Sequence, residues 1–165
     1  MPEANDPLAW VARAEEDFVL ARTALKRKQP LTYGTCFHAQ QCAEKYIKAL
    51  LISMGADFPK THDLLMLNNL CSSNGILLEI DPKHLNTLTD YAVRTRYPGS
   101  DPTADDAKEA IELQKWFVVL QESFWACNTE LNRRKYRLLA DHVLPKKNPP
   151  CLDRSFRRQS AKHGL

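Results

Sequence analysis

Residues 36–54 read CFHAQQCAEKYIKALLISM, and this stretch decides the fold. It contains no Gly or Pro and is dense in Ala, Leu, Gln, Glu and Lys, which favour the helical state. Its apolar residues are spaced three or four positions apart and form one stripe: Cys36, Ala39, Ala43, Ile47, Leu50 and Met54. His38, Gln41, Lys45 and Lys48 share a polar face. The pattern predicts an amphipathic helix that packs in a bundle and presents basic groups on its other side.

The preceding residues predict a partner for this helix. Apolar residues recur at helical spacing from position 7 to about position 28, and Asp6 can accept hydrogen bonds from the first free amides. The acidic residues 15–17 are expected on the solvent side of this first helix. Thr32 is the predicted N-cap of the second helix. Because the connection between the two helices is short, we expect an antiparallel helical hairpin.

Three further helices are predicted after the hairpin. They span residues 62–73, 83–93 and 104 to about 131. A residue able to cap each helix stands before it: Thr61, Asp81 and Thr103. Residues 76–80 have the composition of a strand, but with no second strand to pair with we expect an extended link. The fold class predicted is therefore all-α, an up-and-down bundle of four to five helices.

The charge divides the chain into two parts. Residues 133–165 contain ten Lys or Arg and two Asp, a net charge of +8, which leaves −5 for residues 1–132 within the total of +3. We expect a helical domain over residues 1–132, with a last helix that could extend to about residue 143. Residues 144–165 are predicted to form a basic, disordered tail. Such a tail could bind nucleic acid, bind an acidic partner or only keep the chain soluble.

Several classes of protein do not fit the sequence. No apolar run approaches the roughly 18 residues that span a bilayer, and the acidic N-terminus lacks the apolar core of a secretory signal. The five cysteines form no C-x-x-C pair and have no His at zinc-ligand spacing. We therefore expect a cytoplasmic protein with reduced, mostly buried cysteines, no metal site, no cofactor and no membrane partner.

Three stretches in order carry a family resemblance. They are FHAQQCAEK at 37–45 with KALL at 48–51, PKTHDL at 59–64, and Tyr91 with Arg94 and RYP at 96–98. Together they resemble the HEPN domain (higher eukaryotes and prokaryotes nucleotide-binding), over roughly residues 8–130. The resemblance implies a bundle of four or five helices that forms a homodimer with a cleft across it. It also implies a separately encoded minimal nucleotidyltransferase as partner, in a toxin–antitoxin or related defence module.

Many members of that family are metal-independent ribonucleases with an Arg followed, after four to six residues, by a His. No His stands at that spacing after Arg94 or Arg96. The pair Arg137 and His142 has the spacing but lies beyond the expected loop. The resemblance therefore implies a module that binds a nucleotide or RNA without the family nuclease site. The alternative is a metal-independent ribonuclease with a rearranged site, using Arg96 with His62 or His142, so enzymatic activity stays open.

The strongest candidate site residues follow the fourth helix. Arg94 and Arg96 can bind phosphate oxygens through two parallel hydrogen bonds, and Tyr97 can stack on a base. A structural role is also open to them, because an Arg can bind the last carbonyls of a helix and a Tyr-Pro pair can pack a turn.

Four further candidates come from the other two stretches. Lys45 and Lys48 could form a basic wall of the cleft, or a solvated helix face on which Lys48 pairs with Glu44. His62 could transfer protons near neutral pH, with Asp63 beside it. Alternatively, His62 and Asp63 complete the start of a helix.

Overall fold

The computed structural model describes residues 5–94, 99 and 101–127, with the side chains up to residue 124. Five α-helices make up the described part: α1 (Pro7–Leu25), α2 (Thr32–Ser53), α3 (Leu64–Ser73), α4 (Pro82–Arg94) and α5 (Ala104–Cys127). No strand occurs in these residues. The predicted all-α bundle is confirmed. The extension of the last helix beyond residue 127 and the basic tail lie outside the described residues.

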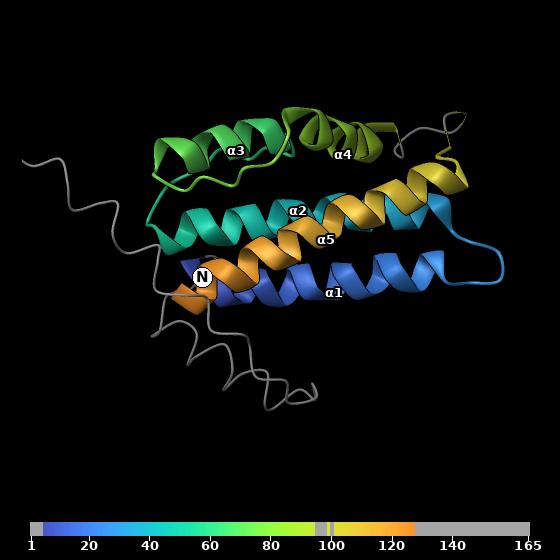
Figure 1. Cartoon of the computed structure of the whole chain (residues 1–165), viewed down its shortest axis with the longest axis horizontal. Coiled ribbons are helices and arrows are strands. Elements are labelled where there is room, and N and C mark those ends of the chain that lie inside the picture. The colour runs from blue at the N-terminus through green and yellow to red at the C-terminus, as the bar shows by residue number, and fades with distance from the viewer. Residues whose placement is uncertain (1–4, 95–98, 100, 128–165) are drawn as a thin grey trace, which may run out of the picture.

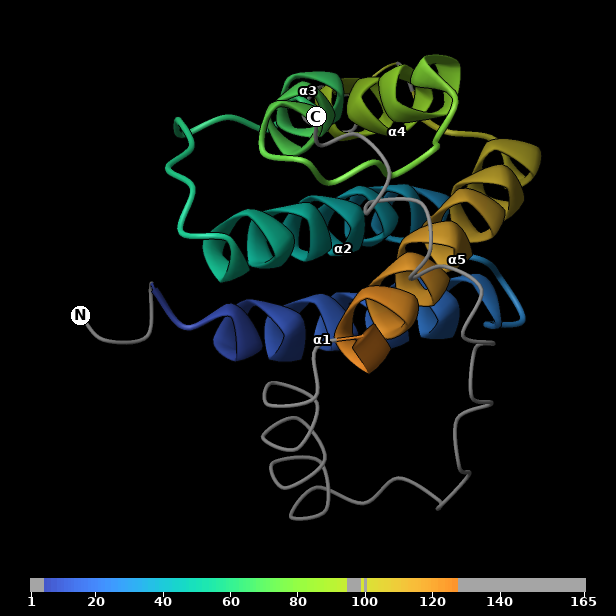
Figure 2. The ribbon, with the colours of Figure 1, turned by 60° about the vertical axis from the view of Figure 1, so that its left-hand side comes forward.

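Helix α2 is the centre of the bundle, because it contacts each of the other four helices. It pairs with α1 in the predicted antiparallel hairpin, and α5 crosses the pair, while α3 and α4 form a second layer (Figures 1 and 2). The apolar stripe of residues 36–54 is buried as predicted from Cys36 to Leu50; only Met54, after the last turn, is exposed. Among the described residues, no helix is long and apolar enough to cross a membrane.

The first and last helices begin as the sequence predicts, whereas the second does not. Asp6 accepts a hydrogen bond from the amide of Leu8, as predicted. Thr103 and Asp106 cap α5 reciprocally, since each side chain accepts a bond from the backbone amide of the other. Thr32, however, is the first residue of α2 and not its cap, and the N-cap residue Leu31 supplies no side-chain bond.

The third helix begins two residues later than predicted. Its N-cap is Asp63, which accepts a hydrogen bond from the amide of Met66, and not Thr61. The hydroxyl of Thr61 instead accepts a bond from the amide of Asp63. Both residue types can cap a helix, but the backbone oxygen of Thr61 accepts a hydrogen bond from Lys48 of α2.

The prediction for the acidic cluster of α1 was wrong at one position. Asp17 is buried, although residues 15–17 were all expected on the solvent side. Its position explains this, because it follows Ala14 by three residues and precedes Ala21 by four, on the stripe that faces α2. Helical spacing therefore places the Asp17 carboxylate inside the hairpin, where it needs partners.

The link between α3 and α4 is extended, as predicted. Ile76 and Leu78 are buried while Leu77 between them is exposed, so the link closes one side of the core. Glu79 has a φ of 48°, a conformation that is uncommon outside glycine. The chain then turns into α4 at Asp81, whose side chain accepts a bond from the amide of Lys83, as expected of a cap.

Candidate functional site

The polar side of α2 is built around a buried carboxylate, Glu44. Lys48 donates to one of its oxygens over 2.7 Å, and Gln40 donates to the other over 2.9 Å. The Nδ1 atom of His62 lies 3.0 Å from that second oxygen. Burial by itself raises the pKa of Glu44, but the hydrogen bonds from Lys48, Gln40 and His62 outweigh it, and the pKa lies below its usual value. Glu44 is therefore a charged, structural centre.

Lys48 is enclosed by protein groups and is only 6% exposed. Besides Glu44, its ammonium group donates to the backbone oxygen of Thr61 over 3.0 Å. It lies 5.6 Å from the ring centre of Trp10 and 5.5 Å from that of Phe58, two rings that pack edge to face. Lys48 therefore fastens the connection between α2 and α3 to the bundle. A role in phosphate binding stays a prediction. In the structural alternative, the pairing of Lys48 with Glu44 is confirmed, but the pair is buried and not on a solvated face.

Lys45 belongs to a second ion pair, across the hairpin. The buried Asp17 of α1 binds the ammonium group of Lys45 with one oxygen, and its other oxygen lies 2.8 Å from Nδ1 of His38. Beside it, the hydroxyl of Tyr46 donates to Glu15 over 2.7 Å. These contacts join α1 to α2 through polar groups next to the apolar stripe. The predicted polar face of α2 is thus in large part a packing face.

His62 and Asp63 both have structural contacts. Asp63 caps α3, and the backbone oxygen of His62 accepts a hydrogen bond from Gln40 over 3.2 Å. The imidazole ring of His62 binds Glu44 on one side, while 57% of its side chain is exposed. His62 is thus open to solvent and held in one orientation, which is compatible with either role that the sequence left open.

The end of α4 and the start of α5 form one end of the bundle. The buried Tyr91 donates to Glu109 over 2.8 Å, and its hydroxyl lies 3.3 Å from Asp106. The backbone amide of Thr103 holds the pKa of Asp106 below its usual value, and the positive charge of Arg94 acts in the same direction. Arg94, the last residue of α4, is exposed. Of the three residues predicted to bind a nucleotide here, the structure describes Arg94 alone; Arg96 and Tyr97 lie outside the described residues.

The described histidines lie at other places on the helices than Arg94. His84 is ten residues before Arg94 on α4, about 15 Å along the helix axis. The thiol of Cys36 is close enough to Arg94 for the arginine charge to lower its pKa, although burial, the larger effect, raises that pKa to about 12. His38 follows Cys36 by two positions, which places it on nearly the opposite side of α2 from Cys36. His62 binds Glu44, which lies about 12 Å beyond Cys36 along the axis of α2.

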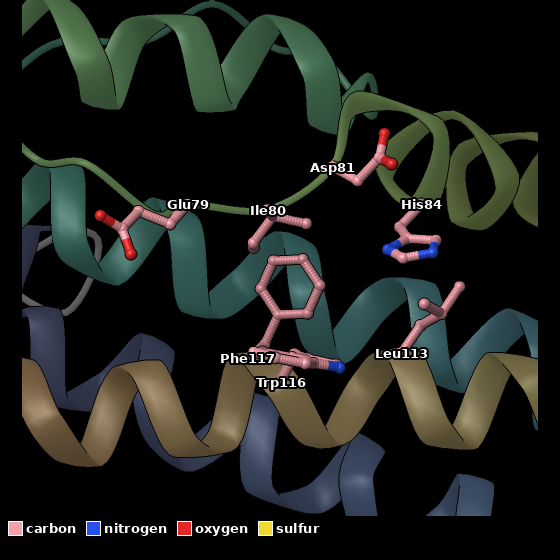
Figure 3. A pocket seen from close by; sticks show the side chains of 7 residues that line it. All are labelled: Glu79, Ile80, Asp81, His84, Leu113, Trp116 and Phe117. Carbon is pink, nitrogen blue, oxygen red and sulfur yellow. The ribbon is translucent and has the colours of Figure 1, made fainter.

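A small pocket lies between the link before α4 and the middle of α5 (Figure 3). Its volume is about 190 Å³, and its lining is Glu79, Ile80, Asp81, His84, Leu113, Trp116 and Phe117. Trp116 is 61% exposed, whereas Phe117 and Leu113 are buried. The pocket is smaller than the roughly 300 Å³ at which small-molecule sites usually begin. Sequence reasoning did not single it out, because its lining comes from two segments about 30 residues apart in the sequence.

Among the described residues, no group of three or more His, Cys, Asp or Glu side chains is arranged to hold a metal ion. Cys36, Cys42 and Cys71 are free and buried, as expected for three of the five cysteines. Burial raises the pKa of the Cys71 thiol to about 12.

Known proteins resemble this chain over most of the bundle. The sequence model of the HEPN domain matches residues 8–123. A protein of Methanocaldococcus jannaschii named "Putative toxin MJ1304" is 29% identical over 120 residues, which cover 62% of this chain and 77% of that protein. The crystal structure of TT1696 from Thermus thermophilus is similar with a TM-score of 0.56 and 25% identity, covering 72% of this chain and 98% of that chain.

Proposed function

The chain belongs to the HEPN domain family, and we propose that it is a binding module for a nucleotide or RNA. In this proposal it acts as a cytoplasmic homodimer and partners a separately encoded minimal nucleotidyltransferase. The name of its relative from Methanocaldococcus jannaschii supports a place in a toxin–antitoxin or defence system.

The position of Arg94 is the observation that carries the proposal. Its side chain is exposed at the end of α4, beside the start of α5 and next to Arg96 and Tyr97 in the sequence. A guanidinium group there can bind phosphate oxygens from solvent. The described histidines make other contacts: His38 binds Asp17 of α1, and His62, before α3, binds Glu44, while His84 is ten residues back on α4. None of these contacts brings a histidine to Arg94, the candidate phosphate ligand. Binding is therefore favoured over cleavage.

Isothermal titration of the full chain with ATP, and separately with a nucleotidyltransferase encoded beside its gene, tests the proposal. We expect heat with at least one of the two ligands, and a weaker response in the Arg94→Ala and Arg96→Ala variants. Lys108→Ala is the matched control, because it also removes one exposed cation from the same end of the bundle. Light scattering after gel filtration should give the mass of a dimer. No heat with either ligand would refute the proposal.

A ribonuclease is the second candidate, favoured by the exposed imidazole of His62. In this reaction Arg96 would bind the phosphate while His62 or His142 assists attack by the RNA 2′-hydroxyl. Cleavage of single-stranded RNA in EDTA, with 2′,3′-cyclic phosphate ends, would support it. Equal cleavage by the wild type and the Arg96→Ala variant would assign the activity to a contaminant.

A further inference from the structure

A long segment at one end of the hairpin contains cations and no acids. Residues 18–43 include four Lys or Arg and no Asp or Glu, a local charge of +4. Three of the cations, Lys26, Arg27 and Lys28, are consecutive and exposed. The carboxylates that flank the segment, Asp17 and Glu44, are buried and already bind cations of α2. Nothing within this segment therefore neutralises the three exposed charges.

The backbone presents these cations on a closed turn. The amide of Lys26 caps α1 by donating to Arg22, and the amide of Leu31 donates to Ala24 across the base of the turn. The three cations thus lie between two fixed helix ends. The N-terminus of α2 opens onto the same turn, and the dipole of that helix adds partial positive charge there.

Aromatic rings follow the cations closely in the sequence, at the start of α2. Tyr33 and Phe37 are one turn apart on α2, and their rings are nearly parallel, at 5°, with centres 6.4 Å apart. His38 packs against the edge of Phe37 at 5.4 Å and is fixed by its bond to Asp17. Tyr33 ends this series of rings and is 50% exposed. An exposed ring supported from behind by a parallel ring is a ready surface for a flat group such as a base.

The turn lies at the same end of the bundle as the end of α4 and the start of α5 (Figures 1 and 2). The first turns of α5 bring acids to that end, but each has a partner. Asp105 pairs with Lys108, Asp106 caps α5, and Glu109 accepts from Tyr91. The hairpin side, where residues 18–43 contain no acid, is therefore the more positive side of this end of the bundle.

We infer that the α1–α2 turn is a binding site for single-stranded nucleic acid. Lys26, Arg27 and Lys28 bind the phosphates, and one base stacks on Tyr33. A single strand is required, because in a duplex the bases are stacked on each other and cannot reach a protein ring. The inference rests on the proposed function only in that RNA is the expected ligand. The residues that it assigns to nucleic-acid binding are different from those of the Arg94 site.

The first test measures the anisotropy of a fluorescein-labelled oligoadenylate with the full chain at several salt concentrations. Replacing Lys26, Arg27 and Lys28 together by Ala should weaken binding at least tenfold at low salt and, for three lost phosphate contacts, reduce the slope of log K against log salt by about 2. The control removes the same charge from exposed lysines elsewhere, in the variant K60A/K83A/K115A, and should stay within about twofold of wild type.

The second test concerns the base. Tyr33→Leu should weaken binding about fivefold or more, while Tyr33→Phe, which keeps the ring, should bind like wild type. An abasic oligonucleotide should bind wild type and Tyr33→Leu equally. Because Tyr33 is half-exposed, both variants should fold, which circular dichroism can verify. Ultraviolet crosslinking followed by peptide mass spectrometry should find the RNA on residues 26–37.

The results separate this inference from the proposed function. If Arg94→Ala abolishes ATP binding while the triple variant of the turn binds RNA like wild type, the inference fails and the proposed function stands. Crosslinks confined to residues 133–165 would overturn it in favour of the basic tail. Polyglutamate that binds as tightly as RNA, without dependence on Tyr33, would overturn it in favour of an acidic protein partner.

Discussion

Replacing Lys48 by Met should destabilise the bundle strongly. Methionine keeps most of the length of the apolar side chain, but it removes the cation that binds the buried Glu44 and lies near the rings of Trp10 and Phe58. Removing one partner of a buried ion pair typically costs about 3–5 kcal/mol, because the other charge stays buried without compensation. Gln40 and His62 still bind Glu44 in the variant, so we expect the lower end of that range, about 3 kcal/mol.

Urea unfolding at neutral pH measures this loss. With an m-value of about 2 kcal/mol per M, a loss of about 3 kcal/mol lowers the midpoint by about 1.5 M. The control is Lys108→Met, which removes a cation from an exposed pair on α5 and should cost no more than about 0.5 kcal/mol. The double variant E44Q/K48M should recover part of the loss, because no charge is then left buried.

The pH dependence gives a second check. The folded-state pKa of Glu44 lies below its unfolded value, so its ionisation stabilises the wild type above about pH 4.3, and this contribution is lost as the pH falls through the lower folded pKa. In K48M the main hydrogen-bond donor is gone and burial raises the pKa instead. The difference between wild type and K48M should therefore shrink on acidification. A K48M variant as stable as the Lys108 control, or a difference independent of pH, would refute the reasoning.

Three smaller predictions concern the caps, the core and the thiols. Asp63→Ala should cost about 1 kcal/mol in urea unfolding and Thr61→Ala clearly less, since Asp63 is the cap of α3; the reverse order would contradict the assignment. Gln114→Met should stabilise by about 1 kcal/mol, because neither polar atom of the buried Gln114 side chain has a nitrogen or oxygen partner among the described residues, and the Cys42 thiol close to it is a weak partner; a loss of stability would show that the amide has a stronger one. Iodoacetamide at pH 8 should label Cys36 in urea but not in the native protein, since its thiol is buried with a pKa of about 12; peptide mass spectrometry would detect native labelling.

The helices and their order could be predicted because the information is local. Apolar spacing identified each helix, and Asp6, Asp81 and Thr103 mark starts that the structure confirms. The short turn between the first two helices required a hairpin, and the central role of residues 36–54 followed from their unbroken stripe. The family resemblance also needed only the sequence, and the match over residues 8–123 confirms it.

The candidate site could be predicted only in part from the sequence. Arg94 was found as an exposed residue at a helix end, but which side chains surround it depends on how α4 meets α5. The cations and rings of the α1–α2 turn, by contrast, are close in sequence. Their charge and spacing could have singled them out from the sequence, whereas only the structure showed that Tyr33 is exposed and stacked.

The sequence by itself determined an all-α bundle of four to five helices, the hairpin of its first two helices and its family. Only the tertiary structure decided that the polar face of α2 is largely internal. An acid and a lysine at helical spacing give the same sequence pattern on a solvated surface and in a buried ion pair. Which of the two forms depends on the residues that a neighbouring helix packs against them. Asp17 meets His38 across 21 residues, and Lys48 meets the carbonyl of Thr61 across 13. Such contacts depend on packing between helices, which no local pattern contains.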